Sequence, residues 1–279
     1  MIYLWALGSA VLYGAADFTG GLATRRASTI PIVFLSQLSG LVSLLLLLPL
    51  LDAATPTRLD MVWGAVAGLT GGIGVALLYR ALAIGTMAVV APTTAVCAVT
   101  IPVVVSVFLG ERPPPLAAVG ILLGVVSIVL VSRQTTPAGE STGYSRGVGT
   151  ALVSGVMIGF FFLALAQTRT EAGMWPLVAS RSLSVLLFGV AAIAARSAIR
   201  MPVPVVGLAV LCGFIDMLAN ALYLVAARVG PLSIVVTLSS LYPASTVLLA
   251  RVVLGERLNL WQVSGVGCAL AAVVLIVSQ

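Results

Sequence analysis

The chain has 279 residues, of which 61% are hydrophobic and only 8% are charged, whereas a soluble domain carries roughly 25% charged residues. This composition excludes a water-soluble fold. The net charge of +6 comes from scattered arginines, and because no basic cluster exceeds the pair Arg25 and Arg26, we expect no nucleic-acid partner. The apolar runs are continuous, so we expect membrane-spanning helices in a lipid bilayer and not a barrel of alternating strands.

A helix needs about 20 mostly apolar residues to cross the hydrocarbon of a bilayer. Ten segments meet this requirement in chain order, at 2–22, 30–51, 61–82, 86–109, 116–132, 146–167, 175–195, 203–227, 231–253 and 259–278. No basic region precedes the first of them, so we interpret it as a span and not as a cleaved signal peptide. A polar connector, 133–146, separates two units of five spans at 1–135 and 146–279.

The two units carry matching motifs. Gly-Glu-Arg occurs at 110–112 and at 255–257, and the same 26 positions separate Gly85 from Glu111 and Gly230 from Glu256. A chance match between two alanine- and valine-rich halves is the alternative to a duplication. Because five spans per unit is an odd number, the two units would enter the membrane in opposite senses. Inverted repeats of this kind are typical of secondary transporters, whose substrate site lies between the halves.

The paired Gly-Glu-Arg loops, the span ends LLYRALAIG (77–85) and ALYLVAARVG (221–230), and the Tyr13-Gly14 pair resemble the EamA-type branch of the drug/metabolite transporter superfamily. The resemblance covers the whole chain. It implies an all-α membrane protein with ten transmembrane helices as two inverted five-helix repeats, located in the cell (inner) membrane. It also implies export of amino acids, metabolites or drugs.

Among the charged residues of the predicted spans, we single out four: Asp17, Arg80, Arg181 and Asp216. Such residues cost at least about 2.5 kcal/mol on insertion scales and are candidates for function. Their depths allow an ion pair of Asp17 with Arg80 toward one membrane face and of Arg181 with Asp216 toward the other. Both pairs could be static salt bridges. Alternatively, an aspartate would bind a proton or a cationic group, and an arginine an anionic group.

Further polar residues are expected to line a central site. Asp216, Asn220 and Tyr223 share one helical face through their i, i+4, i+7 spacing, and Tyr13 and Gln37 are added from the first two spans. Thr94 and Ser239 lie near prolines 92 and 243, which predict kinks in their helices. Their hydroxyls could bond to the backbone carbonyls that the prolines leave without a partner, or they could touch substrate. The predicted substrate-binding residues are Tyr13, Asp17, Gln37, Arg80, Thr94, Arg181, Asp216, Asn220, Tyr223 and Ser239.

The sequence therefore predicts a secondary-active transporter of a small-molecule substrate that works by alternating access. No GxxxxGK[ST] loop occurs, which excludes direct use of ATP by this chain and leaves proton coupling or exchange. The alternative is an uptake permease or exchanger for an anionic or sugar-bearing solute. This function needs Arg80 or Arg181 to be free to meet an anion.

Enzyme activity is not expected, since the chain has no histidine and no catalytic constellation can be assembled. We expect no cofactor and no metal, and the sequence leaves room for a homodimer. Arginines after odd spans outnumber those after even spans, which favours termini outside the cytoplasm, whereas the family pattern implies termini inside. Both orientations remain open.

Overall fold

The structure, a computed structural model, describes residues 2–50, 54–108, 110, 115–132, 147–195, 201–229, 235 and 238–277. In these ranges the regular structure is entirely helical, as predicted. The α-helices are α1 (Ile2–Thr24), α2 (Thr29–Leu47), α3 (Arg58–Ile84), α4 (Met87–Phe108), α5 (Pro115–Ser132), α6 (Val148–Ala166), α7 (Trp175–Ala194), α8 (Val203–Val229), α10 (Tyr242–Leu254) and α11 (Leu260–Val277), with short 3-10 helices at Leu48–Leu50 and Thr170–Ala172.

Seven of the described helices are long and apolar enough to cross a membrane, namely α2, α3, α4, α6, α7, α8 and α11. α5 and α10 contain shorter apolar helical segments. α1 has 23 residues and is not among the seven, and it carries Ser9, Tyr13 and Asp17. The chain is thus a multi-pass helical membrane protein. The connector 133–146, the residues Glu111 and Arg112 and the start of the ninth predicted span lie outside the described residues.

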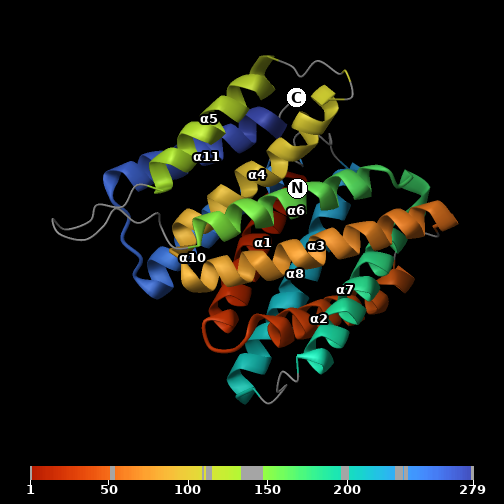
Figure 1. Ribbon diagram of the computed structural model, residues 1–279. Helices are drawn as coiled ribbons and strands as arrows, with labels where there is room; N and C mark the ends of the chain where they lie inside the picture. Colours follow the sequence, from red (N-terminus) through yellow and green to blue (C-terminus); the bar gives the residue numbers. More distant parts are fainter. Residues whose placement is uncertain are drawn as a thin grey trace.

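The helices form one bundle in which α1 is central. In Figure 1, α5 and α11 lie side by side at one edge, α3 and α6 run together through the middle, and α2 and α7 pack at the opposite edge. α1 packs against α8, α10 and α3. Helices from both halves of the chain therefore contact α1, while its face with Leu4, Leu7 and Val11 remains exposed.

Glycines bring α3 close to α6 and α7. A Cβ atom at Gly72 would meet the Ser184 side chain of α7, and one at Gly74 would meet Ile158 of α6. The hydroxyls of Ser184 and Ser154 donate hydrogen bonds of 2.7 Å across these contacts, to the carbonyls of Gly68 and Gly74. The small residues of α3 thus allow close helix packing.

Proline has different effects in the two halves. Pro92 lies inside α4, as predicted, and so does Pro102. Pro243 is the second residue of α10, and a turn precedes that helix at 240–241. The prediction of a proline inside a continuous ninth span is therefore wrong at Pro243, because the first turn of a helix accepts proline at no cost in hydrogen bonds.

The two Gly-Glu-Arg motifs share a backbone conformation at their glycines. The φ angle is 90° at Gly110 and 66° at Gly255, in the left-handed region that favours glycine. At Gly255 this conformation ends α10. It turns the chain so that Glu256 reaches the beginning of α4. The glycine of this motif is thus explained by its turn.

Candidate functional site

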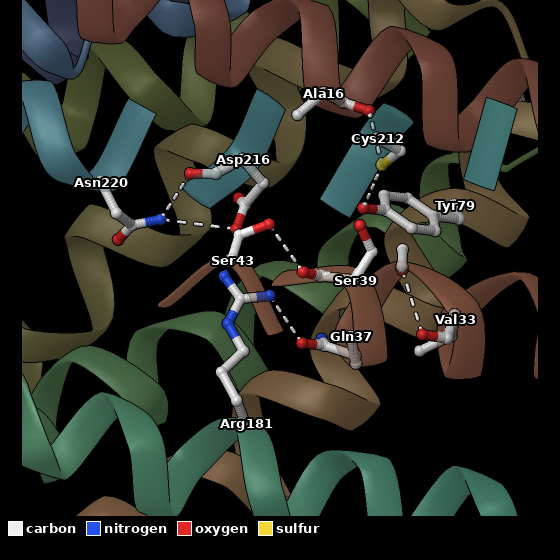
Figure 2. Close-up of polar contacts among 11 residues, drawn as sticks. Ala16, Val33, Gln37, Ser39, Ser43, Tyr79, Arg181, Cys212, Asp216 and Asn220 are labelled. Atoms are coloured by element: carbon white, nitrogen blue, oxygen red, sulfur yellow. Dashed lines mark hydrogen bonds and ion pairs between the residues drawn. The ribbon is translucent and has the colours of Figure 1, made fainter. Parts of the chain in front are cut away.

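An ion pair lies between α7 and α8 in the interior of the bundle. The guanidinium of Arg181 on α7 pairs through Nη2 with Oδ2 of Asp216 on α8. Its Nη1 donates a 2.7 Å hydrogen bond to Oε1 of Gln37 on α2. Figure 2 shows the side chain of Arg181 rising from α7 between these two partners. The predicted pairing of Arg181 with Asp216 is confirmed.

Asn220 completes this group, one helical turn after Asp216. Its Nδ2 donates to the backbone carbonyl of Asp216 at 2.7 Å and lies 3.4 Å from Oδ2 of the same residue. We refer to Gln37, Arg181, Asp216 and Asn220 as the central polar cluster. It joins α2 from the first half of the chain to α7 and α8 from the second.

Glycines make room for the guanidinium. A Cβ atom at Gly40 on α2 would lie 3.0 Å from Nη1 of Arg181, closer than side chains normally approach. Gly213 on α8 packs against the α2 backbone at Ser36. These two positions let α2 and α8 cross closely enough for Gln37 and Asp216 to reach the same guanidinium.

The side chains of the pair are only partly buried, with 15% of Arg181 and 25% of Asp216 exposed. A charge in an apolar surrounding needs a partner, because desolvation of an unpaired ion costs several kcal/mol. The pair and its amide neighbours meet this need while each side chain stays partly exposed. The cluster can therefore contact a polar solute.

A second carboxylate, that of Asp17, lies near the cluster on α1. Asp17 is partly exposed and, among the residues that the structure describes, makes no hydrogen bond or ion pair. It interacts electrostatically with Asp216 on α8, with Tyr79 on α3 and with Tyr242 on α10. Because these neighbours come from three helices, Asp17 faces the bundle interior and not lipid.

Tyr13 connects Asp17 with the cluster. It lies one turn before Asp17 on α1, and its ring meets that of Tyr242 edge-on, with centroids 6.4 Å apart and an interplanar angle of 65°. It also interacts electrostatically with Asp216, Tyr223 and Arg181. Seven predicted site residues are thus brought into one region: Tyr13, Asp17, Gln37, Arg181, Asp216, Asn220 and Tyr223.

Arg80 lies away from this region. Its side chain is exposed on the face of α3 that also carries the exposed Ile73 and Ile84, at i, i+7 and i+11, so it points outward from the bundle. The ion pair that depth alone allowed between Asp17 and Arg80 is absent from the described structure. Depth gives the height of a residue in the membrane but not the side of the helix on which it lies.

Thr94 and Ser239 serve contacts between helices. The hydroxyl of Thr94 donates to the carbonyl of Ala151 on α6 at 3.3 Å. The hydroxyl of Ser239 shares a 2.7 Å hydrogen bond with that of Ser9 on α1. Both side chains are buried, so the structure supports their role in packing and places neither in the central polar cluster.

Sequence reasoning missed four residues near the site: Ser9, Tyr79, Cys212 and Tyr242. The hydroxyl of Tyr79 and Sγ of Cys212 lie 3.0 Å apart, and Cys212 donates to the carbonyl of Ala16 at 3.2 Å (Figure 2). The spacing of Ser9, Tyr13 and Asp17, at i, i+4 and i+8, was a signal for the first of them. The contact of Tyr79 with Cys212 joins distant helices and has no local signal.

The fold is that of a membrane transporter family. The chain belongs to the EamA-like transporter family, which matches residues 1–133 and 145–278, and the resemblance noted in the sequence is confirmed.

A protein of Streptantibioticus cattleyicolor described as "Probable terminal-alkyne amino-acid exporter" is 30% identical over 139 residues, which cover 46% of this chain and 44% of that protein. The match therefore spans less than half of that relative. A crystal structure of a protein with 17% sequence identity is similar in fold, with a TM-score of 0.61 over 98% of this chain and 95% of the other.

Proposed function

We propose that this chain is a secondary-active transporter of the cell (inner) membrane that exports small metabolites of the amino-acid type by alternating access. The observation that carries the proposal is the central polar cluster, in which Arg181, Asp216 and Gln37 meet between otherwise apolar helices. Intramembrane charges that face a bundle interior mark substrate or ion pathways by default. The name of the Streptantibioticus relative supports an amino-acid substrate and the direction of export.

The two-repeat architecture is part of the proposal. Units at 1–135 and 146–279 in opposite orientation would place a substrate site between the halves. In its support, Gln37 belongs to the first unit and both charges of the ion pair to the second. The two ranges matched by the family, 1–133 and 145–278, follow the same division. Relative movement of the units would expose the cluster to one side of the membrane and then the other.

The structure gives less support to transport of an anionic or sugar-bearing solute. That function needs a free arginine at the site. Arg181 is paired with Asp216, and Arg80 lies on the outer face of α3. We therefore propose an ammonium-bearing metabolite in preference to an anion.

Counterflow in proteoliposomes tests the proposal. Proteoliposomes are loaded with unlabelled L-propargylglycine, an amino acid with a terminal alkyne. Entry of the labelled compound is then followed with and without a proton gradient. We expect saturable entry that liposomes without protein lack, and a loss of about tenfold or more in Arg181→Met, since a charged partner in the cluster is removed. Absence of counterflow for this compound and for a panel of amino acids, metabolites and lipophilic drugs would contradict the proposed function.

A further inference from the structure

Two carboxylates lie in the interior, but only one has a cationic partner. Asp216 holds the guanidinium of Arg181 and the amide of Asn220. Asp17 has no such partner among the described residues, and its electrostatic neighbour is the like charge of Asp216. When Asp17 is ionised, the interior region formed by Asp17 and the central polar cluster therefore carries one uncompensated negative charge. A negative charge in this position requires a cation, because an unpaired ion inside a membrane is costly.

Aromatic rings stand beside this unpaired carboxylate. Tyr13 lies one turn before it on α1 and meets Tyr242 of α10 edge-on, and Tyr242 is itself within electrostatic range of Asp17. The ring of Tyr79 packs at Gly20, one turn after Asp17. An ammonium group is attracted both by a carboxylate and by the faces of tyrosine rings, whereas an anion is repelled by both.

Polar groups follow α1 toward this position. Ser9, Tyr13 and Asp17 recur every fourth residue and so share a face over about 12 Å of helix. Ser239 and Tyr242 contact the first two of them from the chain segment around α10. In the described structure, no side-chain oxygen of Asp17 is both buried and without a partner. Since these oxygens make no hydrogen bond there, they are exposed. Asp17 is thus accessible, at the end of a row of polar side chains.

We propose that Asp17, together with Tyr13 and Tyr242, binds the ammonium group of the transported solute, so that substrates are amino compounds and Asp216 serves to hold Arg181 in place. This inference rests on the proposed function and names the group that the transporter recognises. The titratable groups around Asp17 are Asp216 and Cys212 on α8, Tyr79 on α3 and Tyr242 on α10. A proton is the other cation that could neutralise Asp17, and the experiment separates the two.

Binding of three matched probes to the purified full chain tests this inference. L-propargylglycine carries both an ammonium group and a carboxylate. Its methyl ester carries only the ammonium group, and N-acetyl-L-propargylglycine carries only the carboxylate. We expect the first two to bind and the third to bind at least about tenfold more weakly. Asp17→Asn should weaken binding of the two amines about ten- to hundredfold, as expected for loss of a charged hydrogen-bond partner, with little effect on the N-acetyl compound.

Arg80→Gln is the matched control, because it also removes a charge within a span but on the outer face of α3, and its affinities should equal those of the wild type. Size-exclusion profiles and thermal unfolding verify that each variant is folded. Equal wild-type affinity for the amine and N-acetyl probes, or unchanged amine affinity in Asp17→Asn, would overturn the inference. Equal loss of all probes in Asp17→Asn would also overturn it and would favour a proton or structural role. Each of these results leaves the proposed function intact as long as wild-type counterflow is observed.

Discussion

The ion pair in the bundle interior and the two ion pairs at the helix ends use their carboxylates differently. In the interior, Asp216 interacts with the side chains of Arg181 and Asn220. At the helix ends, each carboxylate also accepts backbone N–H groups. Glu256 accepts those of Met87 and Ala88 at 3.0 Å each. The terminal pairs thus satisfy donors that a helix end leaves open, whereas the interior pair satisfies no helix end and is open to a functional role.

The two terminal pairs lie at opposite ends of α3. At its beginning, Asp60 accepts from the backbone of Thr57 at 2.8 Å and of Arg169 at 2.9 Å and forms an ion pair with the Arg169 side chain. At its end, Arg25 donates to the carbonyls of Leu82 and Gly85 at 3.3 and 3.2 Å. An acid at the first turn and a cation at the last both suit the helix dipole. These pairs therefore stabilise α3 and join it to neighbouring loops.

Removal of one interior charge should have the largest effect on stability. In Asp216→Ala the guanidinium of Arg181 loses its counterion, and breaking a buried pair in this way costs about 3–5 kcal/mol. We expect a loss of about 3 kcal/mol in the free energy of unfolding, at the lower end because 25% of the Asp216 side chain is exposed. Thermal and denaturant unfolding in detergent measure it. The double variant Arg181→Met/Asp216→Leu should recover most of this loss, and an equal loss in single and double variants would contradict an uncompensated charge as the cause.

Removal of a terminal carboxylate should cost less. Glu256→Gln replaces the acceptor for two N–H groups of α4 and the partner of Arg25, and we expect a loss of about 1–2 kcal/mol from weakened capping and charge-assisted bonds. The same unfolding assay applies. Glu171→Gln, at an exposed residue of the 3-10 helix, is the control and should leave stability unchanged. A loss in Glu256→Gln as large as in Asp216→Ala would remove the distinction between terminal and interior pairs.

The local cap at the beginning of α3 should contribute still less. Thr57 accepts from the backbone of Asp60 at 3.3 Å, and Asp60 accepts in return from Thr57. Thr57→Ala should therefore cost about 1 kcal/mol, the usual effect of losing such a cap. Thr57→Ser keeps the hydroxyl and should unfold at nearly the wild-type temperature. If the serine variant is as unstable as the alanine variant, the hydroxyl is not the stabilising group.

The same contrast explains how much could be predicted from the sequence. Seven of the predicted spans were predictable because the bilayer imposes length and apolarity, and helices such as α7, predicted at 175–195 and found at Trp175–Ala194, follow directly. The Arg181–Asp216 pair was predictable because both charges fall at matching depths. The position of Arg80 was not predictable. Because α3 has small or apolar residues on every face, its sequence does not indicate which face turns toward the bundle interior.

Long-range partners were the other unpredictable part. The Gly-Glu-Arg motif at 255–257 was visible as a repeat, but nothing local indicates that its glutamate accepts from the N–H groups of Met87 and Ala88, which precede it by more than 160 positions. Likewise, Tyr79 meets Cys212 only because α3 and α8 both pack against α1. Such contacts depend on how helices are arranged, which composition and periodicity leave open.

The smallest expected effect is that of salt, which should weaken the terminal pair of Arg25 with Glu256 but not the interior pair of Arg181 with Asp216. The side chain of Arg25 is 29% exposed and that of Glu256 12%, and their loop is accessible to ions, whereas Arg181 lies between helices. Raising the salt from about 0.1 M to about 1 M shortens the screening length from about 10 Å to about 3 Å. The stability difference between wild type and Arg25→Gln should therefore shrink by less than about 1 kcal/mol, the range for accessible pairs. The stability difference between wild type and Arg181→Met should stay constant, because dissolved ions do not screen a pair that lies between helices and that water reaches only in part. A salt-dependent loss at Arg181 would instead mean that ions enter the interior, as expected of an open transport pathway.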